Sequence, residues 1–256
     1  MEFRESELII NKDGSIFHLH LLPEDIADNI ILVGDPGRVE VVASFFDRIE
    51  LRKQNREFCT ITGAYNGKRI SVISTGIGTD NIDIVVNELD AIANIDLNTR
   101  TRKECHKTLN FIRIGTSGAL QTNIPVDSFL MSEKAIGFDG LLNFYANRNS
   151  VVDVDFEKAF KEHVNWNSLL PSPYVVDASE ELIQKLDNPK IHKGITISAP
   201  GFYGPQGRQL RLPIIDQQIN DKIEAFDFNG QKITNYEMES SAIFGLSKLL
   251  GHNAIT

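Results

Sequence analysis

Twice in the first third of the chain, an apolar strand runs into a glycine-containing turn and then into an amphipathic helix. The first of these blocks covers residues 29–46, and the second covers residues 68–92. In each block the apolar residues change from strand-like to helix-like spacing at the turn. A chain that alternates strands with helices in this way covers a sheet with helices, so the sequence predicts an α/β fold.

Turn signals and apolar spacing predict the remaining elements. An Asn66-Gly67 pair joins the strand-like runs 55–65 and 68–74, and Asn-Gly between two such runs is the strongest short signal for a β-hairpin. The other expected elements, in chain order, are an extended segment at 16–21, strands at 111–114 and 125–131, helices at 154–164 and 178–186, a strand at 194–198, a loop-like stretch at 221–229 and a helix that begins near Glu239.

The composition argues against several classes of function. The formal net charge is −9, and because neutralising phosphates needs clustered Lys and Arg, we expect no nucleic-acid partner. The basic segment 98–107 is interpreted as a surface excursion. Cys59 and Cys105 form no zinc-type spacing, so we expect no metal site and a reducing, cytoplasmic location. No signal-peptide pattern and no run near the ~18 apolar residues of a membrane span is present, so no membrane partner is expected.

The first strand–turn–helix block contains a candidate anion site. Gly34 follows the strand, the turn presents backbone N–H groups at a helix N-terminus, and Arg38 adds a full positive charge. A plain connection between strand and helix explains the same residues equally well. The spacing of a Walker phosphate loop is absent.

Arg113 lies inside an otherwise apolar strand, where an arginine is rarely buried without an anionic partner. That partner is either an internal glutamate or a bound anion. Because Arg38 and Arg56 also lie beside turn-rich strand ends, we favour a bound anion. The Gly-Thr-Ser-Gly turn 115–118 follows directly and offers backbone N–H groups and hydroxyls to it.

The loop 202–208 presents three side chains of different chemistry. Phe202 is a flat apolar plate, Gln206 carries an amide that donates and accepts, and Arg208 is a fixed cationic fork. A small planar heterocycle with adjacent C=O and N–H groups needs this combination, and uracil is such a heterocycle. The alternative is a surface loop with one capping arginine and a buried phenylalanine.

Two acids, Glu237 and Glu239, precede the last apolar helix. Their negative charges suit the positive N-terminus of that helix, so simple capping is one interpretation. The other is a carboxylate that binds two neighbouring hydroxyls of a sugar.

Several blocks together resemble the nucleoside phosphorylases of the purine/uridine phosphorylase superfamily, specifically the uridine phosphorylases. Each block alone is a weak signal, but seven of them follow the family's order over nearly the whole chain. They are Phe17-His18-Leu19, Gly34-Asp35-Pro36-Gly37-Arg38, Arg56-Glu57-Phe58, Ser74-Thr75-Gly76-Ile77-Gly78, Arg113-Ile114-Gly115-Thr116-Ser117-Gly118, Phe202-Tyr203-Gly204-Pro205-Gln206-Gly207-Arg208 and Asn235-Tyr236-Glu237-Met238-Glu239-Ser240.

The resemblance implies a three-layer α/β/α sandwich with a central mixed, twisted sheet, formed by a single nucleoside phosphorylase domain of residues 1–256. It implies reversible phosphorolysis of uridine to uracil and ribose 1-phosphate, in nucleoside salvage or catabolism. Inorganic phosphate would be the co-substrate, and no cofactor would be needed. It further implies a homodimer, or a hexamer built as a trimer of dimers, with active sites shared across a dimer interface.

The resemblance also implies a role for each matching residue. The expected catalytic residues are Arg113, Arg208 and Glu239. Arg56 and His18 would act in the active site of a neighbouring subunit, His18 toward the 5′ hydroxyl. By ligand, the residues are Gly34, Arg38, Arg56, Arg113 and Thr116 for phosphate; Phe202, Gln206 and Arg208 for the base; and His18, Met238 and Glu239 for the ribose.

Relatives that cleave purine nucleosides lack the pair Gln206 and Arg208, and related nucleosidases lack the phosphate arginines. The resemblance therefore favours a pyrimidine substrate and phosphate as the attacking group. The alternatives are a non-catalytic nucleoside-binding protein and a purine nucleoside phosphorylase or nucleosidase of the same fold.

Three features depart from the family's pattern. The basic segment 98–107 is inserted relative to the bacterial enzymes. Asn81 replaces a small residue that, in some relatives, helps Glu57 to bind a structural monovalent cation. Whether this chain binds such a cation is therefore left open by the resemblance. The chain stops at Thr256, where the family continues with a strand, a lid and a last helix. If Thr256 is the natural end of the chain, the resemblance implies that the base pocket lacks part of its wall and its closing lid, and that activity is weak or absent.

Overall fold

The computed structural model describes residues 2–256, and the chain forms two compact units. Unit 1 comprises the residues up to Ile77 together with Asn81–Ile114 and Leu250–His252. Unit 2 comprises Gly78–Asp80, Gly115–Leu249 and Asn253–Thr256. Among residues 2–256, no helix combines the length and the apolar character needed to cross a bilayer.

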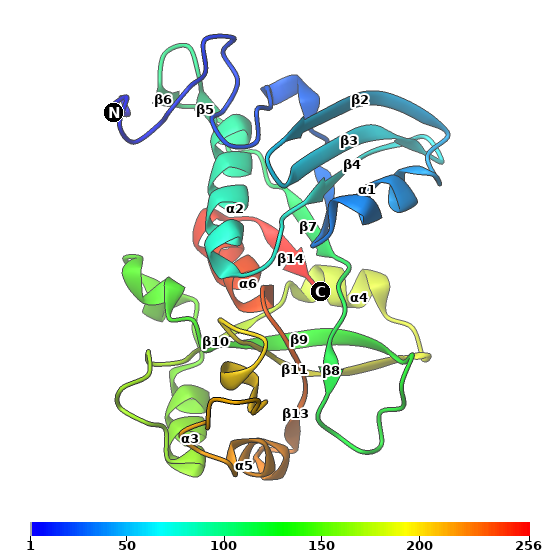
Figure 1. The fold of residues 1–256 in the computed structure, drawn as a ribbon. Helices are drawn as coiled ribbons and strands as arrows, with labels where there is room; N and C mark the ends of the chain where they lie inside the picture. Colours follow the sequence, from blue (N-terminus) through cyan, green and yellow to red (C-terminus); the bar gives the residue numbers. More distant parts are fainter. Residues whose placement is uncertain (1) are drawn as a thin grey trace. The chain divides into compact units, whose positions relative to one another are not determined.

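Unit 1 contains a mixed sheet with its strands in the order β7-β1-β4-β3-β2 (Figure 1). β1 runs parallel to both β4 and β7, whereas β2, β3 and β4 follow one another antiparallel. The predicted hairpin is confirmed, because Asn66 and Gly67 have φ values of 48° and 73°, as a tight two-residue hairpin turn requires. The strands are β1 (Asn29–Val33), β2 (Arg48–Asn55), β3 (Phe58–Tyr65), β4 (Lys68–Ser74) and β7 (Asn110–Arg113).

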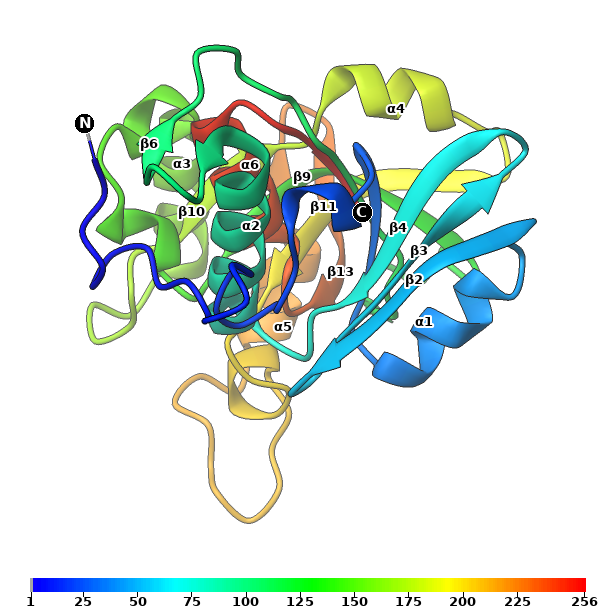
Figure 2. The same cartoon turned by 90° about the horizontal axis from the view of Figure 1, so that it is seen from above.

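Helix α1 (Pro36–Ala43) lies along one face of this sheet against β3 and β4 (Figure 2). The helix begins where the sequence dictates, because the Asp35 carboxylate accepts the Gly37 N–H at 2.8 Å and Pro36 is pre-organised for the first turn. The other elements of unit 1 are the 3-10 turn η1 (Pro23–Asp25), α2 (Thr79–Asn94), whose first two residues belong to unit 2, and a small hairpin of β5 (Ile95–Asp96) and β6 (Thr101–Arg102).

Unit 2 contains a second mixed sheet, with strands in the order β10-β9-β11-β13-β12. Its central strand β11 runs parallel to β9 and β13, whereas β10 and β12 pair antiparallel with their neighbours, and the short β8 pairs antiparallel with β13. The strands are β8 (Gly118–Ala119), β9 (Phe129–Gly137), β10 (Tyr174–Asp177), β11 (Ile191–Ser198), β12 (Asp227–Phe228) and β13 (Gln231–Glu237).

An aromatic core joins the helices of unit 2 to this sheet. Phe156 and Phe160 from α3 are fully buried and contact Phe226, which follows α5, edge to face. The remaining elements are the 3-10 turns η2 (Leu141–Phe144), η3 (Arg148–Ser150) and η4 (Gly204–Gln206), the helices α3 (Val154–Val164), α4 (Glu180–Leu186), α5 (Ile219–Ala225) and α6 (Ser240–Leu250), and β14 (Asn253–Ile255).

Three expected elements are wrong in whole or in part. Residues 16–21 are not extended: the Ile16 N–H donates to the Leu21 carbonyl, and His20 has a φ of 57°, so the segment is a turn. The stretch 221–229 is not a loop at its start, because α5 continues to Ala225 with the apolar Ile223 buried. The strand expected at 125–131 begins only at Phe129, after a turn in which the Ser128 N–H donates to the Pro125 carbonyl.

The predicted α/β class with mixed sheets is confirmed, and the described strands form two large mixed sheets and the small β5-β6 hairpin. The helix expected at 154–164 has those same limits, because the Asp153 carboxylate accepts the Phe156 N–H at its start and Asn165 takes a left-handed conformation at its end. The organisation of residues 1–256 as a single domain stays a prediction.

Candidate active site

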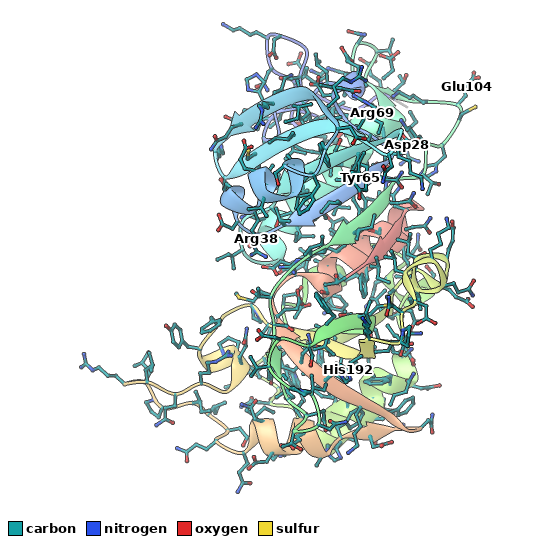
Figure 3. The ribbon with its side chains drawn as sticks, turned by 90° about the vertical axis from the view of Figure 1, so that its right-hand side faces the viewer. Asp28, Arg38, Tyr65, Arg69, Glu104 and His192 are labelled. Carbon is teal, nitrogen blue, oxygen red and sulfur yellow. The ribbon has the colours of Figure 1, made fainter. Side chains whose placement is uncertain are left out.

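In unit 1, the predicted phosphate residues Gly34, Arg38 and Arg113 lie at or just beyond the carboxyl ends of neighbouring parallel strands. Arg38, in the first turn of α1, donates from Nη1 to the Ile114 carbonyl at 3.4 Å, just beyond β7 (Figure 3 labels Arg38). A Cβ atom placed on Gly34 would lie 3.5 Å from Arg38 Nη2 and from the Gly76 carbonyl. The ends of β1, β4 and β7 therefore converge, which is where parallel strands present ligand-binding groups.

Arg113 is the last residue of β7 and pairs in register with Leu32 of β1. Its side chain is almost fully buried, with 7% of its surface exposed. The structure thus places a buried guanidinium one residue before Ile114, whose carbonyl Arg38 contacts. Arg38 and Arg113 therefore lie at the same strand edge, and guanidinium groups are well suited to binding oxyanions.

Arg56 lies at the exposed turn between β2 and β3, with a φ of 54°. The Ser74 hydroxyl donates to the Glu57 carbonyl at 2.5 Å, so this turn lies beside the end of β4. The Asn55 amide donates to the His18 carbonyl at 2.8 Å. The residue before Arg56 therefore contacts the backbone of His18, the other residue expected to act on a neighbouring subunit.

The His18 ring is held by Glu88 of α2. His18 Nδ1 lies 2.6 Å from Glu88 Oε1, and the same carboxylate accepts the backbone N–H groups of His18 and Leu19. Because an ionised carboxylate only accepts, Nδ1 carries the proton in this contact. Nε2 is then the ring nitrogen that faces away from Glu88.

In unit 2, the three predicted base residues form one compact group. The Arg208 guanidinium lies over the Phe202 ring, 4.1 Å from its centroid, and donates to the Phe202 carbonyl at 2.8 Å. It also donates to Gln206 Oε1. Gln206 is buried, with 4% of its surface exposed, whereas the Phe202 ring is half-exposed. The structure therefore brings the three side chains together, and their role in binding a base stays a prediction.

The turn that contains Thr116 lies beside this base group. A Cβ atom on Gly118 would lie 3.3 Å from Arg208 Nη2, so glycine allows the guanidinium to approach the backbone closely. Gly118 is in β8 and pairs with Tyr236 of β13. Thr116 is two residues earlier, in the exposed part of the turn.

The two acids before α6 have different tasks. The Glu237 carboxylate accepts the backbone N–H groups of Glu239 and Ser240 at 2.9–3.0 Å and the Ser198 hydroxyl at 2.5 Å, so Glu237 caps the helix. Glu239 is buried, with 3% of its surface exposed, and its Oε1 accepts the Gly78 N–H at 2.8 Å. Glu239 is therefore not the cap, and Met238 lies half-buried between the two acids.

A buried polar network supports the same helix start. The Asp139 carboxylate accepts the Tyr174 and Ser241 hydroxyls at 2.9 and 3.0 Å, and the Ser241 N–H donates to the Ser198 hydroxyl. Burial raises the pKa of the Asp139 carboxyl group above its ordinary value, and the hydrogen bonds that it accepts offset only part of that rise.

The family model of the phosphorylase superfamily matches residues 28–256 of the chain. The chain belongs to this superfamily. Three similar proteins illustrate the relationship. The uridine phosphorylase of Thermococcus kodakarensis is 28% identical over 253 residues, which cover 99% of this chain and 79% of that protein. A DeoD-type purine nucleoside phosphorylase of Listeria monocytogenes is 27% identical over 239 residues, which cover 93% of this chain and 83% of that protein.

Among solved structures, a Trypanosoma brucei nucleoside phosphorylase described as showing uridine phosphorylase activity superposes with a TM-score of 0.85. It is 29% identical in sequence, and the match covers 97% of this chain and 88% of that one. The proteins similar to this chain therefore include both uridine phosphorylases and purine nucleoside phosphorylases.

Two residues that contact the base loop or one another, Asn220 and Tyr236, are not among the site residues expected from the sequence. Asn220 on α5 donates from Nδ2 to the Gln206 carbonyl at 3.3 Å, and Tyr236 of β13 donates to Asn220 Oδ1 at 3.2 Å. Tyr236 lies inside one of the seven family blocks and could have been noticed there. Asn220 has no local signal, because it lies outside every element that the sequence predicts.

Asp90, His106 and His252 form a separate group in unit 1, with ligand-type atoms within 4.8 Å of one another. The Leu109 N–H donates to His252 Nδ1 at 3.2 Å, so Nε2 carries the proton and faces Asp90 at 3.1 Å. A metal ion bound at Nε2 would require the opposite tautomer and the loss of the Leu109 bond. We therefore interpret this group as a hydrogen-bonded link between α2 and the residues around 252.

Proposed function

We propose that this phosphorylase superfamily member catalyses reversible phosphorolysis of uridine, giving uracil and ribose 1-phosphate. The observation that carries the proposal is the group of Phe202, Gln206 and Arg208. Gln206 and Arg208 are joined by a hydrogen bond, and the guanidinium lies over the Phe202 ring. The names of the relatives from Thermococcus kodakarensis and Trypanosoma brucei support the same reaction.

The base group fits uracil through its hydrogen-bonding pattern. The Gln206 side chain already accepts from Arg208 through Oε1, which leaves its Nε2 group to donate and the second lone pair of Oε1 to accept. Uracil presents a carbonyl beside an N–H, so it satisfies both, while its second carbonyl accepts from Arg208. The Phe202 ring offers an apolar face for the base.

The mechanism follows from where charge develops. As phosphate attacks the anomeric carbon, the N-glycosidic bond lengthens, the sugar acquires positive charge and the leaving uracil acquires negative charge. Arg208 and Gln206 stabilise the uracil, and bound phosphate stabilises the sugar. Because the leaving group is stabilised directly, no strong general acid is required.

The residues of unit 1 are proposed to bind phosphate. Arg38 and Arg113 provide guanidinium forks, which bind oxyanions in pairs, and Gly34 allows close approach of the backbone. Thr116 adds a hydroxyl. Glu239 is proposed to hold the 2′ and 3′ hydroxyls of ribose, with Met238 against the sugar.

We further propose a homodimer, or a hexamer made of such dimers, in which Arg56 and His18 act on the neighbouring subunit's substrates. The exposed position of Arg56 beside His18 supports this arrangement. The proposal places the protein in the cytoplasm, in nucleoside salvage or catabolism.

A structural monovalent cation is a separate proposal. Glu57 and Asn81 both approach Gly76, since a Cβ atom there would lie 3.3 Å from Glu57 Cγ and 2.3 Å from Asn81 Nδ2. Carboxylate and amide oxygens are the hard ligands that such a cation prefers. Thermal unfolding in potassium and in choline chloride tests it: equal midpoints would rule the cation out.

A panel of nucleosides tests the proposed function. With phosphate present, uridine should be consumed and ribose 1-phosphate should form, and 2′-deoxyuridine and thymidine measure how strictly the 2′ position is read. Inosine and adenosine should react much more slowly. Faster consumption of inosine than of uridine would replace the proposal with a purine nucleoside phosphorylase, which the Listeria monocytogenes relative represents.

A further inference from the structure

Asn220 lies directly behind the base group of unit 2. It is in the first turn of α5, half-buried, and its Nδ2 donates to the Gln206 carbonyl at 3.3 Å. Gln206 is also the residue whose side chain accepts from Arg208. One asparagine therefore contacts the backbone of the residue whose amide is proposed to bind the base.

Tyr236 fixes which way the Asn220 amide points. The Tyr236 hydroxyl donates to Asn220 Oδ1 at 3.2 Å, so the amide must turn its Nδ2 group toward Gln206. Tyr236 is 4% exposed, and burial raises the pKa of its phenol well above the ordinary value, so its hydroxyl keeps its proton and remains a donor. The result is a directed chain of hydrogen bonds from β13 to the base loop.

The Asn220 amide packs closely against the backbone of the base loop. Gly207, which separates Gln206 from Arg208, has a φ of 71°. A Cβ atom on Gly207 would lie 2.5–2.7 Å from the Asn220 amide atoms, so any side chain there would displace the Asn220 amide. Glycine is therefore needed both for the backbone conformation and for the packing of Asn220 against it.

We propose that Asn220 is a positioning residue, which sets the angle between the Gln206 amide and the Arg208 guanidinium and so determines how well the base is bound. The inference rests on the proposed function of that pair. Asn220 acts on the base without touching it, through the Gln206 carbonyl and the Gly207 backbone, and Tyr236 keeps it in the required orientation.

The chain of hydrogen bonds suggests two variants of Asn220, both of which should lower activity. Asn220→Ala removes the donor, and kcat/KM for uridine should fall about tenfold, while KM for phosphate stays within about twofold of wild type. Asn220→Asp keeps the shape and the acceptor for Tyr236 but turns an acceptor toward the Gln206 carbonyl. Its activity should fall further, although an acid in the first turn of a helix does not lower the unfolding temperature.

A double-variant cycle tests whether Tyr236 acts through Asn220. Tyr236→Phe alone should lower kcat/KM for uridine several-fold, and Tyr236→Phe combined with Asn220→Ala should be no worse than Asn220→Ala. Asp221→Asn is the matched control, because Asp221 is the exposed neighbour on the same turn of α5, and it should behave as wild type.

The experiment measures uridine turnover and, by calorimetry, uracil binding for wild type and these variants. If wild type turns over uridine but Asn220→Ala and Asn220→Asp match Asp221→Asn, the positioning role is wrong and the proposed function stands. If wild type binds uracil without turnover, the same comparison of affinities decides the positioning role. If wild type neither binds uracil nor consumes uridine, both the proposed function and the inference fail.

Discussion

At the scale of single residues, the base group depends on the geometry of Arg208 as well as on its charge. Its guanidinium contacts the Phe202 ring, the Phe202 carbonyl and the Gln206 amide at once. A planar fork with five N–H donors can make these contacts together, whereas an ammonium group cannot.

Replacing this arginine with lysine should therefore be costly although the charge remains. Arg208→Lys is expected to lower kcat/KM for uridine by about a hundredfold, because the stabilisation of the leaving uracil needs aligned donors. Steady-state kinetics checks this. Arg211→Lys, an exposed change three residues later in the same loop, is the control and should keep wild-type kinetics. Equal activity of the two variants would exclude Arg208 from the base site.

Base selection by Gln206 is a second property at this scale. Cytidine lacks the N–H between its ring carbonyl and its exocyclic group, and it presents an amino group in place of the second carbonyl. Gln206 would then lose a donor partner and Arg208 would face a donor, which leaves buried polar groups unpaired. We expect uridine to be consumed at least about a thousandfold faster than cytidine in a phosphate-containing assay. Comparable rates would contradict the assigned pattern.

At the scale of secondary-structure elements, the junction between β13 and α6 separates two roles within three residues. Glu237 caps α6 and accepts from Ser198, whereas Glu239 turns its carboxylate toward the Gly78 N–H. The sequence alone left capping and sugar binding as alternatives for this pair, and the geometry assigns the cap to Glu237.

The two glutamates should respond differently to the same substitution. Glu237→Gln leaves buried donors without a charged acceptor and should lower the free energy of unfolding by about 2 kcal/mol. Glu239→Gln should leave stability nearly unchanged but lower kcat/KM for uridine at least tenfold, since a neutral amide binds ribose hydroxyls less strongly. Chemical denaturation and kinetics on both variants check this. A large loss of stability in Glu239→Gln alone would reverse the assignment.

The network at the start of α6 also predicts a pH dependence of stability. Because the pKa of Asp139 is raised above its ordinary value of 3.8, the folded state binds its proton more tightly than the unfolded state. The stability that this gives is fully present below pH 3.8 and is lost as the pH rises through the raised pKa. Denaturant unfolding from pH 4 upward should show a decline in wild type that is absent from Asp139→Asn. Parallel profiles would contradict it.

How much of these elements could be read from the sequence depends on whether the signal is local. The Asn66-Gly67 hairpin and the helix 154–164 carry their own turn and cap residues, and both are confirmed. Helix α5 was missed because its seven residues offer little apolar periodicity, and its burial of Ile223 depends on distant strands. Asn220 was missed for the same reason, since its partners Gln206 and Tyr236 lie 14 and 16 residues away.

At the scale of the whole molecule, the proposed site residues are divided between the two units. The phosphate arginines and His18 belong to unit 1, whereas Thr116, the base residues and the ribose residues Met238 and Glu239 belong to unit 2. The proposed function also requires Arg56 from a second copy of the chain.

Sharing of residues between subunits is tested by mixing two inactive variants. If Arg56 acts in the neighbouring active site, Arg56→Ala and Arg208→Ala each remove activity, but a dimer of one with the other contains one site with both arginines. Co-expression with random pairing should then restore about a quarter of wild-type activity, because half the dimers are mixed and each has one intact site of two. Restoration to no more than the level of the single variants would show that Arg56 acts within its own subunit or not at all.

The measurement that tests the central claim most directly is the loss of uridine, followed by absorbance, with and without inorganic phosphate. We predict loss only when phosphate is present, with one ribose 1-phosphate formed for each uracil released. Loss at the same rate without phosphate, with free ribose as the product, would contradict phosphorolysis and identify a nucleosidase. No loss under either condition, with uridine still bound, would instead identify a nucleoside-binding protein.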